Sequence, residues 1–123
     1  MRLQESGEMY LESIYVLSKQ QNYVRSIDIS EYMGYSKPSV SRAVNLLKTN
    51  GYIVMDDENF ITLTESGLEI AQKIYSRHTV LTKMLVALGV PQDVAAEDAC
   101  RMEHTISDTS FEAIKRHLEE HGK

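Results

Sequence analysis

The stretch that decides the fold runs from residue 26 to residue 63 and reads SIDISEYMGYSKPSVSRAVNLLKTNGYIVMDDENFITL. Its first part, 26–33, has the spacing of a short helix and is followed by Gly34, a residue type that commonly closes helices. A second helix is expected over about 36–49, because Ser36 can cap its first turn. Two helices joined by a tight glycine turn predict a helix-turn-helix unit.

Two short β-like runs follow this unit. They cover 52–55 and 60–63, and the polar turn DDEN at 56–59 separates them, so they predict a hairpin. A helix-turn-helix followed by a hairpin is the pattern of the winged helix-turn-helix. We therefore predict a mainly α protein with a winged helix-turn-helix DNA-binding domain over residues 1–70.

The start of the second helix carries small, hydroxylic and basic side chains, which hydrogen-bond phosphates and base edges. This helix lies in the major groove in such domains. The predicted DNA contacts are Ser36, Lys37, Pro38, Ser39, Ser41 and Arg42. The same pattern also fits two packed helices of an α-rich protein that binds no DNA.

The net charge of the whole chain argues against binding to nucleic acid, but the distribution of charge along the chain does not. The 123 residues have a formal net charge of −5. Residues 25–51 hold four basic and two acidic side chains, whereas 52–70 hold five acidic side chains and no basic one. The recognition helix therefore lies in a modestly basic segment between acidic ones, which is compatible with DNA binding by a dimer.

The second half is expected to be helical throughout. A long helix begins at 64–67 and continues with 3.6-residue spacing to Gly89, and helices follow from Pro91 to about Met102 and over 108–118. We assign residues 71–123 to a second, all-helical domain.

Composition excludes several classes of protein. A single Cys excludes an intramolecular disulfide framework and is typical of a reducing compartment. No apolar run approaches the roughly 20 residues of a membrane span, and the start of the chain has acidic residues where a signal peptide has basic ones. We expect a cytoplasmic protein without a membrane partner.

The most informative segment for chemistry is CRMEH at 100–104. On a helix, Cys100, Glu103 and His104 would share one face, and all three are ligands for divalent transition metals. Taken singly, each side chain has a structural alternative, as do Met9, Glu12 and His78. A lone Cys or Met is more often a core residue, and a carboxylate more often faces water. The spacing favours a metal-binding role for Cys100, Glu103 and His104 together.

The chain resembles the diphtheria toxin repressor family of iron- and manganese-dependent repressors over nearly its whole length. The resemblance rests on EMYLESIYVL at 8–17, YSKPSVSRAVNLL at 35–47, LTESG at 63–67, YSRHTVLTKML at 75–85 and EDACRMEHTISD at 97–108. It implies that Met9, Cys100, Glu103 and His104 form the regulatory metal site, with help from a backbone carbonyl and water.

The resemblance also marks departures from the iron-type members. Thr82 and Ala96 stand where their ancillary metal site needs a carboxylate and a histidine, so that site is expected to be absent. Glu12 and His78 instead match manganese-type residues that bind a second, neighbouring metal. The chain ends soon after the helix over 108–118, so we expect the short form without a C-terminal SH3-like domain.

Ligand chemistry predicts which metal is sensed. A thioether and a thiolate are soft donors that suit Fe(II) better than Mn(II), and Co(II), Ni(II) or Zn(II) would bind in vitro. We expect Fe(II) as the co-repressor, with Mn(II) as the alternative. The resemblance implies that residues 71–123 are a metal-binding and dimerisation domain. It also implies a homodimer that reads palindromic operator DNA and represses metal-uptake genes. Apolar positions around 84–94 and 111–118 are the candidate dimer interface.

Two other functions compete with this one. The first is a metal-independent winged-helix regulator in which the Cys and His residues are structural. The second is a small metalloenzyme, which we do not expect, because the sequence offers no catalytic base or nucleophile beyond the ligands themselves.

Overall fold

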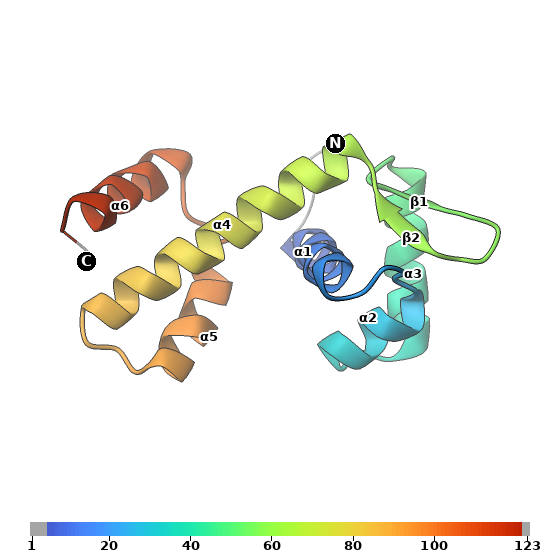
Figure 1. Cartoon of the computed structure of the whole chain (residues 1–123), viewed down its shortest axis with the longest axis horizontal. Helices are drawn as coiled ribbons and strands as arrows, with labels where there is room; N and C mark the ends of the chain where they lie inside the picture. Colours follow the sequence, from blue (N-terminus) through green and yellow to red (C-terminus); the bar gives the residue numbers. More distant parts are fainter. Residues whose placement is uncertain (1–4, 122–123) are drawn as a thin grey trace. The chain divides into compact units, whose positions relative to one another are not determined.

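The computed structural model describes residues 5–121, and the chain divides into two compact units between Gln72 and Lys73 (Figure 1). None of the described helices is both long enough and apolar enough to cross a membrane.

The first unit has the element order predicted for a winged helix-turn-helix. It contains α1 (Glu5–Gln20), α2 (Ser26–Met33), α3 (Lys37–Thr49), β1 (Ile53–Met55), β2 (Ile61–Leu63) and the start of α4 (Glu65–Ala87). The predicted mainly α class, the two helices of the motif and the hairpin are thus confirmed, with boundaries that differ by one or two residues.

The turn between α2 and α3 is built by a glycine and a serine. Gly34 has a φ of 74°, in the left-handed region that favours glycine, and its N–H donates to the Ser30 carbonyl. Ser36 is the N-cap of α3, and its Oγ accepts a hydrogen bond from the Ser39 N–H at 3.3 Å. The chain therefore reverses in a few residues and leaves the start of α3 at the surface.

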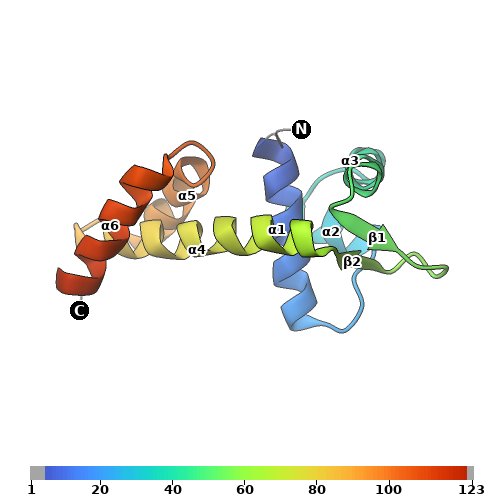
Figure 2. The same ribbon diagram turned by 90° about the horizontal axis from the view of Figure 1, so that it is seen from above.

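The hairpin is antiparallel, with Val54 opposite Thr62, and its turn extends away from α1 and α2 (Figures 1 and 2). The Asp56 carboxylate closes the turn by accepting from the backbone N–H groups of Glu58 and Phe60, both at 2.9 Å. The acidic turn therefore has a structural role, since it satisfies its own backbone donors.

A buried apolar cluster joins the three helices and the hairpin of this unit. Its members are each at most 6% exposed and are Tyr10, Leu11, Ile14, Leu17, Val24, Ile29, Val40, Val44, Leu47, Ile53, Ile61 and Ala71. Because α3 contributes only its inner face, its outer face is free for contacts with other molecules.

The junction between hairpin and α4 is closely packed. Thr64 Oγ1 donates to the Gly51 carbonyl at 2.7 Å and accepts from the Gly67 N–H at 3.2 Å. A Cβ at Gly67 would lie 2.0 Å from the backbone oxygen of Tyr52. Only glycine therefore fits at position 67, in the first turn of α4.

The second unit contains the remainder of α4 together with α5 (Gln92–Met102) and α6 (Asp108–His121). Figures 1 and 2 show α5 and α6 beside the C-terminal half of α4. Leu81, Ala95, Ala99 and Phe111 are buried apolar side chains of this unit. The predicted all-helical character of this part is confirmed.

Candidate metal centre

Three ionisable side chains meet inside the second unit. Glu103 follows the end of α5, and its side chain is fully buried. One carboxylate oxygen, Oε2, lies 3.0 Å from His78 Nδ1 of α4, and the other, Oε1, lies 3.4 Å from His104 Nε2. The His104 side chain is 1% exposed and that of His78 is 31% exposed. The cluster therefore has one buried carboxylate between two imidazoles, and His78 opens to the surface.

The chemistry of this cluster fits a divalent cation. A buried carboxylate is costly unless it is paired with a cation or accepts hydrogen bonds. Glu103 Oε1 is buried and makes no hydrogen bond with the described part of the chain. Imidazole nitrogen and carboxylate oxygen are ligands of Fe(II), Mn(II), Co(II) and Zn(II), so these residues could hold such an ion.

Cys100 lies in the last full turn of α5 and is half-buried. Glu103 keeps helical dihedral angles and donates its N–H to the Ala99 carbonyl, but α5 ends at Met102 and His104 lies in the following turn. Among the described residues, the ligand atoms of Cys100, Glu103 and His104 do not all lie within 4.8 Å of one another, and neither do those of His78, Glu103 and His104. The helical face expected for the three extends only to Glu103, because the backbone leaves the helix there.

The other two sequence candidates, Met9 and Glu12, belong to the first unit. They lie one turn apart on α1, and both are half-buried. Ser13 Oγ donates to the Met9 carbonyl at 2.9 Å. Their participation in the centre stays a prediction.

A buried arginine beside the cluster was missed by the sequence reasoning. Arg77 is 6% exposed, and its guanidinium donates to the carbonyls of Glu103 and Ile106 and to the carboxylate of Asp108. Hydrogen bonds from Lys73 and then from Arg77 hold the pKa of the Asp108 carboxyl below its usual value. No signal in the sequence pointed to it, because Arg77 lies in the mixed polar and apolar stretch QKIYSRHT at 72–79.

The predicted DNA contacts lie together at the start of α3. Ser36, Lys37, Pro38, Ser41 and Arg42 are exposed and Ser39 is half-buried. Ser39 Oγ accepts from Ser36 Oγ at 2.9 Å and from Arg42 Nη2 at 3.4 Å. These side chains form one exposed hydroxylic and basic surface.

Comparisons with known proteins identify the family. Residues 2–59 match the model of the N-terminal DNA-binding domain of iron-dependent repressors, and residues 64–122 match that of the metal-binding and dimerisation domain of the same family. The chain belongs to the iron-dependent repressor family. This family consists of transcriptional repressors.

Curated relatives of this repressor family cover most of the chain. An uncharacterised HTH-type transcriptional regulator of Methanocaldococcus jannaschii is 33% identical over 119 residues, which cover 95% of this chain and 95% of that regulator. The transcriptional regulator MntR of Escherichia coli O157:H7 is 32% identical over 113 residues, 92% of this chain and 73% of MntR.

Solved structures of the family agree with the fold. The manganese regulator SloR is 31% identical with a TM-score of 0.83, and a manganese-dependent transcriptional repressor in complex with manganese is 29% identical with a TM-score of 0.83. Each comparison covers 92% of this chain but only 53% and 52% of the solved proteins. The chain thus spans about half the length of those proteins.

Proposed function

We propose that this chain is a cytoplasmic, metal-dependent transcriptional repressor that binds palindromic operator DNA as a homodimer and represses metal-uptake genes. The observation that carries the proposal is the buried Glu103 carboxylate between His78 and His104, in the same chain as an exposed recognition helix. Each carboxylate oxygen of Glu103 lies beside one imidazole, and Oε1 accepts no hydrogen bond from the described residues, which supports a cation at this position.

The ligand set that we propose adds Met9, Glu12 and Cys100 to the two histidines and Glu103. The support for these additions is the resemblance of EMYLESIYVL and EDACRMEHTISD to the family's metal-binding segments. A cation bound there would supply positive charge to ligands from both units. Sharing those ligands would restrict the angles accessible to the DNA-binding unit, which shifts a population of conformations toward the one that fits DNA.

Fe(II) is the ion that we propose as co-repressor. The support is the donor set, since the thiolate of Cys100 and the thioether of Met9 suit Fe(II) better than the oxygen-preferring Mn(II). Mn(II) remains the alternative, and two of the solved relatives carry manganese in their names.

Anaerobic binding of DNA selected from a random pool tests metal and function together. We expect Fe(II) at micromolar concentration to raise DNA affinity, and Cys100→Ala to lower the response to Fe(II) more than the response to Mn(II). An equal loss for the two ions would contradict the choice of Fe(II). DNA binding that no divalent ion changes would instead favour a metal-independent regulator, in which His78 and His104 merely satisfy Glu103.

The DNA-binding surface is the exposed start of α3. Arg42→Ala should lower DNA affinity roughly 10-fold and reduce the slope of log affinity against log salt by about one, because one phosphate contact is lost. Its thermal midpoint and metal affinity should not change, because Arg42 is exposed. Lys48→Ala, at the opposite end of α3, is the matched control. An Arg42→Ala protein with wild-type DNA affinity and salt slope would contradict the assignment of the start of α3 as the DNA-binding surface.

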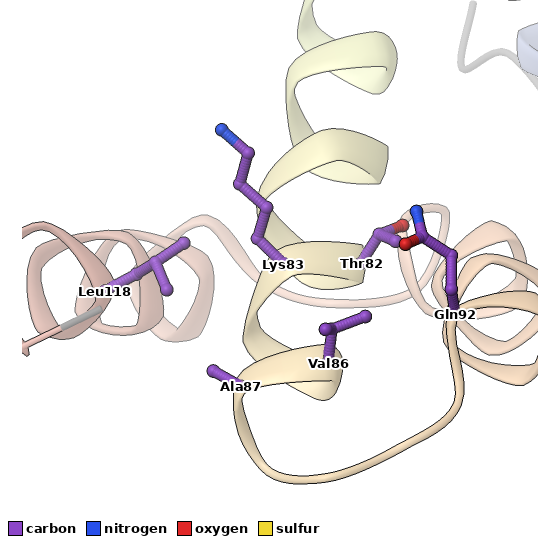
Figure 3. Close-up of a pocket in the computed structure, with 6 residues that line it drawn as sticks. All are labelled: Thr82, Lys83, Val86, Ala87, Gln92 and Leu118. Atoms are coloured by element: carbon purple, nitrogen blue, oxygen red, sulfur yellow. The ribbon is translucent and has the colours of Figure 1, made fainter. Parts of the chain in front are cut away.

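The dimer interface that we propose uses apolar positions of 84–94 and 111–118. Val86, Leu88 and Val94 are 40%, 74% and 44% exposed in the chain. Figure 3 shows an adjoining pocket lined by Val86 and Ala87 of α4 and Leu118 of α6, together with Thr82, Lys83 and Gln92. A second copy covering this apolar surface would remove it from water, and the half-sites read by the two α3 helices would then lie about one DNA turn apart.

A further inference from the structure

The connection between α5 and α6 is organised around one buried side chain. Arg77 Nη1 donates to the carbonyl oxygens of Glu103 at 3.0 Å and Ile106 at 2.8 Å, and Nη2 donates to Asp108. The ring of Phe111 lies beside the guanidinium, with its centroid 5.5 Å from Cζ. The Arg77 side chain of α4 thus contacts both ends of the turn, at Glu103 and Ile106, and also Asp108, the first residue of α6.

Glu103 is consequently held at two points by neighbouring residues of α4. Its backbone carbonyl accepts from Arg77, and its carboxylate lies 3.0 Å from the imidazole of His78. The arginine contact fixes the position of the backbone, whereas the histidine contact fixes the direction of the side chain. Neither contact alone determines where the carboxylate oxygens lie.

We propose that Arg77 is a positioning residue of the metal centre. It holds the turn 103–107 so that the Glu103 carboxylate lies beside both His78 and His104, and through Asp108 it holds the first residue of α6 in the same arrangement. The inference deepens the proposed function and rests on it, because the centre it positions is the one assigned there.

Arginine suits this position for two physical reasons. Its planar guanidinium carries several N–H donors in fixed directions, so it can bond two carbonyls and a carboxylate at once, which a lysine ammonium on a flexible stem matches poorly. Its charge also lies at the C-terminal end of α5, where the helix dipole favours a cation. Burial of the charge is offset by these acceptors and by the face of Phe111.

Binding of Co(II), followed by its visible absorption well below the melting temperature, tests the proposal. We expect Arg77→Met to lower Co(II) affinity about 10- to 100-fold, the range found when groups that orient ligands are removed, and to change the Co(II) spectrum. Arg77→Lys should give an intermediate affinity and a shifted spectrum. The matched control is Arg101→Met, which removes an equal charge from an exposed arginine of α5, 72% exposed.

Several outcomes would overturn the proposal. One is a folded Arg77→Met protein with wild-type Co(II) affinity and spectrum. Another is an equal loss in Arg101→Met, which would indicate that charge alone is responsible. If Arg77→Met does not fold, the comparison uses Arg77→Lys, and failure of both to fold would mean that Arg77 stabilises the whole unit. Wild-type protein that binds no Co(II) would instead defeat the proposed function itself.

Discussion

Glu103→Gln should abolish the metal response without unfolding the chain. Glutamine keeps the shape of the side chain but removes the charge that faces His78 and His104. Because Glu103 is fully buried and supplies both oxygens, we expect metal affinity to fall by about 100-fold or more, beyond the loss caused by removing a group that only orients a ligand. The metal-dependent gain in DNA affinity should disappear with it.

The metal-free Glu103→Gln protein should be less stable than wild type but still folded. Removing one partner of a buried ion pair costs up to about 3–5 kcal/mol, and glutamine reduces that cost because its amide group can still form hydrogen bonds with the imidazoles of His78 and His104. Glu97→Gln is the matched control, since it makes the same substitution on α5 at an exposed ion pair with Arg101. A Glu103→Gln protein that binds Fe(II) or Mn(II) like wild type would contradict the assignment of the centre.

Gly67→Ala should destabilise the DNA-binding unit strongly. The added Cβ would lie 2.0 Å from the backbone oxygen of Tyr52, which cannot move without displacing the hairpin. Overpacking typically costs about 1–3 kcal/mol, and a clash with backbone belongs at the upper end. We expect a loss of about 3 kcal/mol, measured by urea unfolding, and a thermal midpoint lower by roughly 10–20 °C.

Ser66→Ala is the control for Gly67→Ala, because Ser66 is the exposed neighbour in the same helical turn. It should change stability by less than about 0.5 kcal/mol, as surface substitutions usually do. A Gly67→Ala protein as stable as Ser66→Ala would show that the hairpin and α4 are not packed as described.

Much of the first unit could be predicted from local signals in the sequence. Gly34 and Ser36 mark the end of one helix and the start of the next, and the structure uses them in those roles. The hairpin followed from two short apolar runs around an acidic turn. The close contact at Gly67 could not be predicted, because it depends on Tyr52, which lies 15 positions earlier in the chain.

The candidate metal centre could be predicted only in part. Helical spacing pointed to Cys100, Glu103 and His104, but α5 ends at Met102, and the end of a helix is set by packing as well as by local sequence. The contact between Glu103 and His78 joins residues 25 positions apart, and only the resemblance to known repressors suggested His78. The role of Arg77 could not be predicted from a sequence motif, because Arg77 binds backbone carbonyl groups, which every residue carries.

The central claim is that metal binding and DNA binding are coupled, and a linked titration tests it most directly. The affinity of the chain for Fe(II) is measured anaerobically, with and without saturating operator DNA. Coupling is reciprocal, so DNA should tighten Fe(II) binding by the same factor by which Fe(II) tightens DNA binding. Equal Fe(II) affinities with and without DNA would contradict the account.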